Sequence, residues 1–219
     1  MNEFIREVDD EYRRDRIAQF WKRYSGAVVA LLVLLVLGVG GWRYWQHTQR
    51  TQAETAAARY QDAIGTAAGG DSEATQKALE GLSAAGPEGY RTLALFRLAA
   101  EKGRQSAEEG AKAFDALGTN AAVSPLLQDL ARLRAAVLRL DGAPDQAVAA
   151  LERLAAPTGA YRHTAREMLG LAALRRADFE AAGRWFDQIA ADRETPANLR
   201  SRLELYAGLV AGGPVQVTQ

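Results

Sequence analysis

Residues 169–189 read LGLAALRRADFEAAGRWFDQI, and this stretch decides the fold. Its second half has a small residue at Ala182, a large apolar residue four positions later at Phe186 and another at Ile189. Residues three and four apart lie on one face of a helix, so the small side chain lets a second helix approach and the large ones fill the groove beneath. With Leu169-Gly170 in a preceding helix, the stretch predicts two closely packed helices.

The same triplet occurs three more times upstream, at offsets of 35, 37 and 35 residues between successive copies. The other copies are Thr75/Leu79/Leu82, Gly110/Phe114/Leu117 and Ala147/Leu151/Leu154. A helix pair of about 34 residues whose second helix carries A-x3-F resembles the tetratricopeptide repeat. The sequence therefore predicts an all-α fold, an irregular tetratricopeptide-like α-solenoid, and a non-repeating helical bundle is the alternative. The residues expected to pack between repeats are Leu79, Phe114, Leu151, Ala182 and Phe186.

Turn signals separate the expected helices after the apolar N-terminal stretch. These helices are 51–67, 72–84, 89–102, 105–117, 125–140, 144–156, 160–176, 178–191 and 196–211. Ser124-Pro125 and Thr195-Pro196 each place a capping hydroxyl before a proline, whose missing N–H costs nothing at the first helical position. Ser72, followed by Glu73, is expected to cap in the same way.

One segment is expected to cross a membrane. Residues 24–42, YSGAVVALLVLLVLGVGGW, form nineteen uncharged residues, enough for a hydrocarbon core of about 30 Å. Aromatic side chains, which concentrate at water–lipid interfaces, flank the segment; they are Trp21, Tyr24, Trp42, Tyr44 and Trp45. A cleaved signal peptide is the alternative, but its short basic leader differs from the 23 residues found here, which include six acids.

Basic residues predict the orientation of this span. Six precede it and three follow within about twenty residues; they are Arg6, Arg13, Arg14, Arg16, Lys22 and Arg23, then Arg43, Arg50 and Arg59. The excess keeps the N-terminus in the cytoplasm and exports the remainder. We therefore expect a cytoplasmic amphipathic segment at 1–23, a transmembrane helix at 24–45, a tetratricopeptide-like domain at 46–211 and a disordered tail at 212–219.

Two short strings add a family resemblance. GWRYW at 41–45 and AAARYQDAI at 56–64, in this layout, resemble the bacterial ancillary subunit of the SecYEG translocon. The resemblance implies a bacterial inner-membrane protein with a periplasmic repeat domain, a non-enzymatic interaction scaffold whose partners are translocon subunits and periplasmic chaperones. The segment NEFIREVDDEYRRDR at 2–16 departs from the enterobacterial form. A self-assembling, envelope-organising structural protein of the same fold is the alternative, so a homo-oligomer is possible.

The composition argues against several other classes of function. The chain has 27 basic residues, 27 acidic residues and no cysteine, so nothing favours a nucleic-acid partner, a thiolate metal site or cysteine catalysis. His163 and Glu167 share a helical face, yet no third ligand accompanies them and Arg162 and Arg166 oppose a cation. We expect no catalytic residue, no cofactor and no metal.

Binding by a helical solenoid is expected in the groove lined by the first helix of each pair. If the repeat register holds, four charged residues are candidates to face a partner there: Arg132, Arg139, Glu167 and Arg175. Trp185, next to the packing residue Phe186, is expected to contact the core rather than a partner.

Overall fold

The computed structural model describes the backbone of residues 3–213 and the side chains of residues 21–213. All regular secondary structure in this range is helical, which confirms the predicted all-α class. The helices are α1 (Glu3–Ala68), α2 (Ser72–Ala85), α3 (Glu88–Gln105), α4 (Ala107–Thr119), α5 (Pro125–Arg139), α6 (Pro144–Leu154), α7 (Arg162–Arg175), α8 (Phe179–Ala191) and α9 (Ala197–Gly212). The chain divides into two compact units, Met1–Thr55 and Ala56–Gln219. Of the tail expected at 212–219, Gly212 belongs to α9 and Gly213 follows it, whereas residues 214–219 lie outside the described range. Most side chains of the amphipathic segment expected at 1–23 also lie outside it.

The N-terminal unit consists of α1 as far as Thr55, and its apolar side chains are exposed. Leu31, Leu34 and Leu37 are 65%, 67% and 66% exposed, respectively. Within the described residues, α1 is the one helix long and apolar enough to cross a membrane. The helix expected at 51–67 continues directly from the one expected at 24–45, because both are parts of this single helix.

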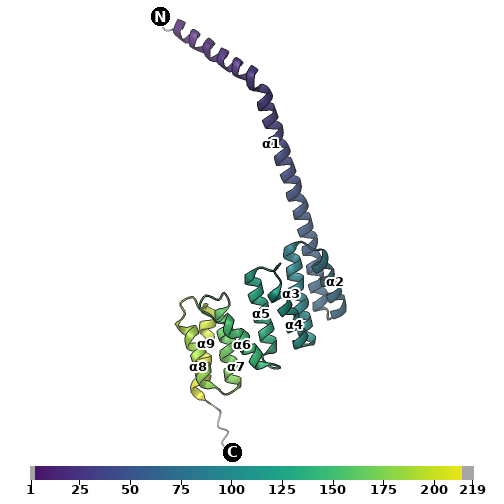
Figure 1. Cartoon of the computed structure of the whole chain (residues 1–219), viewed down its shortest axis with the longest axis vertical. Helices are drawn as coiled ribbons and strands as arrows, with labels where there is room; N and C mark the ends of the chain where they lie inside the picture. The colour runs from purple at the N-terminus through teal and green to yellow at the C-terminus, as the bar shows by residue number, and fades with distance from the viewer. Residues whose placement is uncertain (1–2, 214–219) are drawn as a thin grey trace, which may run out of the picture. The chain divides into compact units, whose positions relative to one another are not determined.

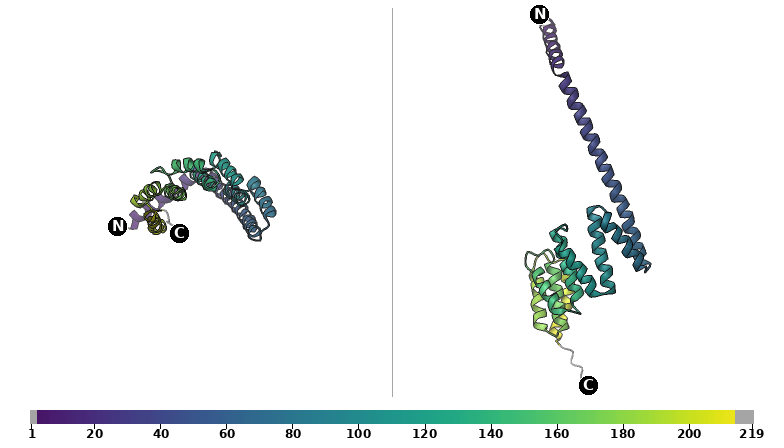
Figure 2. Two further views of the ribbon diagram at one scale, coloured as in Figure 1. Left: turned by 90° about the horizontal axis from the view of Figure 1, so that it is seen from below. Right: turned by 45° about the vertical axis from the view of Figure 1, so that its right-hand side comes forward.

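The C-terminal unit is an array of helix hairpins. We call residues 56–68 of α1 together with α3, α5, α7 and α9 the first helices, and α2, α4, α6 and α8 the second helices. From α2 to α9, consecutive helices pack against one another, and residues 56–68 of α1 join α2 and α3 in the cluster that contains Ala63 and Leu79. Figures 1 and 2 show these helices side by side in sequence order. This is the solenoid arrangement that the repeat period predicts.

Each of the four triplets lies on one second helix, where it packs between neighbouring first helices. All twelve triplet residues are buried. Leu79, Leu151 and Ala182 are fully buried, and Phe114 and Phe186 are each 5% exposed. Apolar burial at about 25 cal/mol per Å² is the main force that holds such pairs together. Four apolar clusters follow one another along the array, each shared by adjacent helices.

Two glycines let helices approach more closely than any side chain would allow. A methyl group added at Gly110 of α4 would lie 2.6 Å from the backbone nitrogen of Gly103 in α3. A methyl group added at Gly170 of α7 would lie 2.6 Å from Cζ of Phe186 in α8. Leu169-Gly170 and Phe186 therefore meet at the helix contact expected from the stretch 169–189.

The helix starts differ from the predicted caps. Asp71, rather than Ser72, caps α2, and its carboxylate accepts a hydrogen bond from Ala74 N at 3.0 Å. Ser124 precedes Pro125 at the start of α5 but makes no side-chain cap hydrogen bond. Thr195 was wrongly predicted to cap: its buried hydroxyl donates to Ile189 O at 2.6 Å, so it closes the α8–α9 loop instead. At α5, Pro125 removes one of the N–H groups that a cap would otherwise pair.

Candidate functional site: a groove between first helices

An open apolar surface of the C-terminal unit lies between the first helices α3 and α5. Two adjoining pockets of about 500 and 400 Å³ share Leu93, Phe96 and Leu130 as lining residues. We call this combined depression the first-helix groove. Its walls also include Leu127, Val137, Leu138, Phe114 and, from α1, Tyr60, together with the polar Thr92. A groove lined by successive first helices is the surface that helical solenoids offer to partners.

The groove owes its apolar lining to a second stripe on each of its two helices. On α3 the core residues are Ala94, Leu98 and Ala99, whereas Leu93 lies on the groove side and Phe96 lines the groove while its ring also contacts Phe114 of the core. Leu93 remains 48% exposed and Val137 of α5 remains 36% exposed, so the groove is apolar yet open. This second stripe is the signal that would have located the groove in the sequence, because a solvated face needs no leucines.

Charges are distributed unevenly along the groove. Glu88 lines one end, where α3 and α5 both begin. Arg97, Arg104 and Arg134 line the other end. The buried carboxylate of Glu101 offsets part of this charge, at 2.8 Å from Arg97 Nη2 and 3.5 Å from Arg104 Nη1. Arg134 has no ion-pair partner in the described part of the chain, so this end keeps an excess of positive charge.

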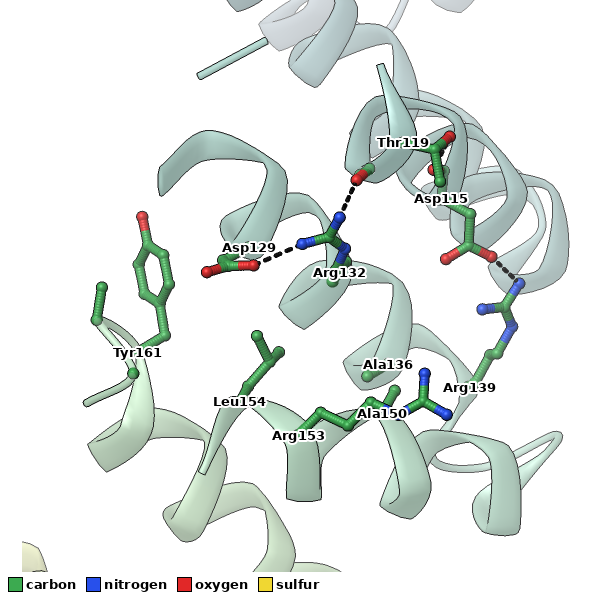
Figure 3. A pocket seen from close by; sticks show the side chains of 13 residues that line it. Asp115, Thr119, Asp129, Arg132, Ala136, Arg139, Ala150, Arg153, Leu154 and Tyr161 are labelled. Atoms are coloured by element: carbon green, nitrogen blue, oxygen red, sulfur yellow. Dashed lines mark hydrogen bonds and ion pairs between the residues drawn. The ribbon is translucent and has the colours of Figure 1, made fainter. Parts of the chain in front are cut away.

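A second pocket, of about 550 Å³, lies on the other side of α5, between α4, α6 and the loop at 159–161 (Figure 3). Arg132 and Arg139 line it, and both guanidinium groups are engaged. Arg132 donates to Asp129 Oδ1 at 2.7 Å, and Arg139 donates to Asp115 Oδ2 at 2.5 Å. The Asp115 contact raises the pKa of Arg139. Arg132 is thus paired within α5, and Arg139 joins α5 to α4, so neither guanidinium group is free.

The four predicted groove residues do not come together. Arg132 and Arg139 line the pocket between second helices, on the side of α5 away from the first-helix groove. Glu167 is buried, 5% exposed, and accepts hydrogen bonds from Arg202 and from Tyr206 Oη at 2.8 Å. Arg175 is exposed and pairs with Asp141. All four lie on first helices, but none of their side chains lines the first-helix groove.

The Glu167 contacts join α7 to α9. The carboxylate raises the pKa of Arg202 through its hydrogen bonds, whereas burial, followed by the hydrogen bond to Glu167, raises the pKa of Tyr206. A buried carboxylate needs such partners because removing a charge from water is costly. Glu167 is therefore a structural residue within the described fold.

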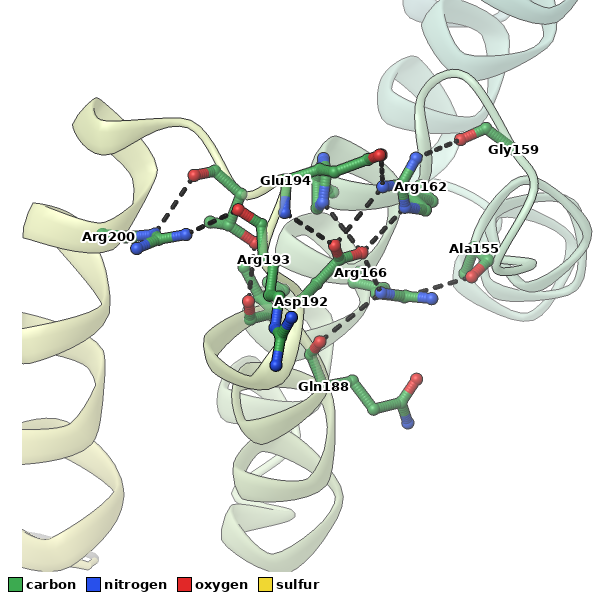
Figure 4. A network of polar contacts seen from close by, with 12 residues as sticks. Ala155, Gly159, Arg162, Arg166, Gln188, Asp192, Arg193, Glu194 and Arg200 are labelled. Atoms are coloured by element: carbon green, nitrogen blue, oxygen red, sulfur yellow. Dashed lines mark hydrogen bonds and ion pairs between the residues drawn. The ribbon is translucent and has the colours of Figure 1, made fainter.

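A larger polar network holds the α8–α9 loop against α7 (Figure 4). Arg162 donates to Asp192 Oδ2 at 2.8 Å and to Glu194 Oε2 at 2.5 Å. The buried Arg166 donates to Ala155 O at 3.1 Å. Arg162, the backbone N–H of Glu194 and His163 together hold the pKa of Asp192 far below its usual range. Sequence patterns missed this network, since charges in an alanine-rich helix do not reveal their partners.

His163 belongs to this network. Its Nε2 lies 3.0 Å from Asp192 Oδ2, within ion-pair distance, although the two atoms are not aligned for a hydrogen bond. With two arginines beside the same carboxylate, the surroundings do not suit a cation. Among the residues that the structure describes, no cluster of three His, Asp or Glu side chains is arranged to hold a metal.

The remaining predicted residues fall into two groups. The five aromatic residues at the ends of the apolar segment are all exposed on α1. Trp185 is half-buried and packs against the cluster that contains Leu151 and Leu169.

At the ends of the apolar segment of α1, Trp21 and Trp42 are separated by about 32 Å along a helix that rises 1.5 Å per residue, close to the thickness of a hydrocarbon core.

Comparison with known proteins bears on the family. No curated protein and no solved structure matches the chain. The family described as a tetratricopeptide repeat-like domain matches residues 18–204, which is most of the sequence. Domains of this kind serve as interaction modules between proteins, and no catalytic family is indicated. The helix hairpins, the buried triplets and this match together show that the chain belongs to the tetratricopeptide repeat-like domain family.

Proposed function

We propose that this protein is a membrane-anchored interaction scaffold that acts beside the Sec translocon and passes exported chains to periplasmic chaperones. The observation that carries the proposal is the first-helix groove, an open apolar surface on an interaction domain that follows an apolar helix. The strings at 41–45 and 56–64 supply the choice of the translocon.

Membrane anchoring is supported by the exposure of α1. A run of aliphatic side chains that stays more than half exposed is unstable in water, and lipid is the medium that would cover it. Arg23 and Lys22 at one end favour retention of that end in the cytoplasm. We therefore propose that α1 crosses the inner membrane of a bacterium and that the C-terminal unit lies in the periplasm.

Cysteine accessibility tests this orientation without background, because the chain contains no cysteine. Glu3→Cys and Glu73→Cys provide one thiol on each side of the apolar segment. In intact spheroplasts, a membrane-impermeant maleimide should label only the cysteine at position 73, and lysis should expose the one at position 3. Labelling of position 3 before lysis would refute the orientation.

Site-specific photocrosslinking in native membranes tests the scaffold role. A photoreactive residue at Leu93, in the groove, should crosslink translocon subunits or periplasmic chaperones. The matched control carries the same residue at Glu80, an exposed position on the second helix α2. Recovery of neither class of protein from the Leu93 position would remove the proposal.

Self-assembly is a second candidate, favoured by one observation. Leu205 and Leu209 of α9 are 69% and 57% exposed and lie four residues apart, on one face of the helix. A second copy would cover that face. Sedimentation of the detergent-solubilised chain should then show an oligomer that Leu205→Glu/Leu209→Glu dissociates; a monomeric wild type would exclude this candidate.

A further inference from the structure

The first-helix groove has a polarity that specifies how a ligand lies in it. Its Glu88 end is lined by one carboxylate and no basic side chain, while its other half is lined by three guanidinium groups, of which that of Arg97 is paired with the buried Glu101. The apolar residues Leu93, Phe96 and Leu130 lie between these ends. Such a surface complements a segment whose apolar side chains are bounded by acidic residues on one side only.

Two of the arginines are available to a ligand. The Arg104 side chain is 69% exposed, and its nearest carboxylate, Glu101, lies 3.5 Å away and is shared with Arg97. Arg134 is exposed and makes no hydrogen bond or ion pair with any described residue. By contrast, Asp129 and Asp115 satisfy Arg132 and Arg139 in the pocket on the other side of α5.

The length of the groove sets the size of the ligand. From Glu88 to Arg104, α3 rises about 24 Å at 1.5 Å per residue. This distance accommodates about four turns of an amphipathic helix, a ligand that binds apolar grooves through side chains on one face.

We propose that the groove binds an amphipathic polypeptide segment in one direction, with its acidic end over Arg104 and Arg134 and its neutral or basic end over Glu88. The inference rests on the proposed function, since it names the chemistry of the chain that the scaffold receives. The groove would then prefer segments whose two ends differ in charge, and it would disfavour segments with lysines at the end that faces Arg134.

The probes are two fluorescein-labelled sixteen-residue peptides that share leucines on one helical face. One peptide carries glutamates in its last turn, and the other carries lysines at the same positions. With the full chain in a nonionic detergent, anisotropy should show tighter binding of the glutamate peptide. Arg134→Glu should weaken that binding about three- to tenfold, because attraction between exposed charges becomes repulsion, and should strengthen binding of the lysine peptide.

The matched control is Arg153→Glu, an exposed arginine on α6 outside the groove. It should leave both affinities unchanged, and thermal unfolding should confirm that both variants fold. A benzophenone at the glutamate end of the peptide should crosslink near Val137, not near Thr92. Equal affinities for the two peptides, or equal effects of the two variants, would overturn the polarity.

The two proposals fail separately. If Leu93 crosslinks translocon subunits while Arg134→Glu has no effect on either peptide, the scaffold role stands and the polarity is wrong. If the peptides bind with the expected preference but no translocon or chaperone crosslinks are found, the ligand chemistry stands and the proposed function is wrong.

Discussion

At the scale of single residues, the array depends on places where a side chain is missing. The Gly103–Gly110 contact brings the backbones of α3 and α4 together, and Gly170 makes room for the ring of Phe186. In both places the small residue is what allows the large residues of the triplet to be buried between helices.

Alanine at these glycines should therefore destabilise the fold. We expect Gly170→Ala to cost about 1–3 kcal/mol through overpacking against Phe186. Gly110→Ala should cost more, because the Gly103 backbone cannot rotate away as a ring can. Chemical denaturation measures both effects. Gly81→Ala is the control: nothing lies within 4 Å of its new methyl group, so helix propensity should give up to about 1 kcal/mol of added stability. A neutral Gly110→Ala would contradict the close approach.

Asp192 should make stability depend on acid pH. Its pKa is lower in the folded chain than in the unfolded chain because Arg162 and the Glu194 N–H hold the charged form. The stabilisation is therefore complete above the unfolded aspartate pKa of about 3.9 and is lost as the pH falls below that value. Asp192→Asn should be less stable at pH 7 and should lose less stability on acidification. Asp187→Asn, an exposed control on α8, should keep the wild-type profile in denaturation curves from pH 7 to pH 2.

Residue-scale prediction succeeded where the determinant is local. The triplets repeat at helical spacing, and an apolar residue on the inner face of a helix is buried because exposure to water is unfavourable. Leu79 and Phe186 are therefore buried, as their spacing indicates. A charged residue can be stable either in solvent or buried beside a partner of opposite charge. Glu167 could have faced solvent, and only the placement of Arg202, 35 positions later, makes it a buried partner. No spacing rule contains that information.

At the scale of elements, α9 closes the last apolar cluster. Its Leu199 is buried with Phe186 and Ile189, and the rings of Phe186 and Tyr206 stack at 4.8 Å between centroids. Helix α9 also provides both hydrogen-bond partners of Glu167. The element thus covers α8 and neutralises a buried charge of α7.

Removal of α9 should destabilise α7 and α8 and leave α2 and α3 unaffected. A chain that ends at Thr195 lacks both partners of Glu167 and uncovers the apolar cluster that contains Phe186 and Ile189, so α7 and α8 should lose stability. Amide hydrogen exchange should accelerate in α7 and α8 and stay unchanged in α2 and α3. The control chain ends at Gly213 and keeps the whole of α9. Faster exchange throughout the array would show that the repeats unfold as one unit.

The elements themselves were predictable to within a few residues because glycine, proline and asparagine mark most of their ends. Which charged side chains of each first helix lie beside the groove was not predictable. Helix α5 carries two arginines on one side, Arg132 and Arg139, and a third, Arg134, on the other. Packing against α4 and α6 decides which side is which, and a single helix sequence does not encode that rotation.

At the scale of the whole molecule, each described helix from α2 to α9 packs mainly on its sequence neighbours, and contacts to the next helix but one, such as that of Glu167 in α7 with Arg202 in α9, are fewer. Stability is then a sum of local and nearest-neighbour terms. The sequence indicated this architecture through its near-constant repeat offset, and the family match over residues 18–204 confirms it.

Mutations should consequently act regionally. Leu79→Ala and Ile189→Ala each empty a fully buried site, at opposite ends of the array, and each should cost about 2–5 kcal/mol. Hydrogen exchange should accelerate mainly in α2 and α3 for the first variant and mainly in α8 and α9 for the second. The two variants serve as controls for each other, and identical exchange profiles would argue against a chain of independent contacts.

Packing between consecutive helices also has a consequence for biogenesis. A protein whose contacts are local in sequence folds quickly, because few long loops must close first. A chain that emerges from a channel with its N-terminal side first can add helices in order, each one meeting a surface that is already formed. Within the described residues, α9 covers the cluster that contains Phe186 and Ile189, so this cluster stays open to water until α9 has folded onto it.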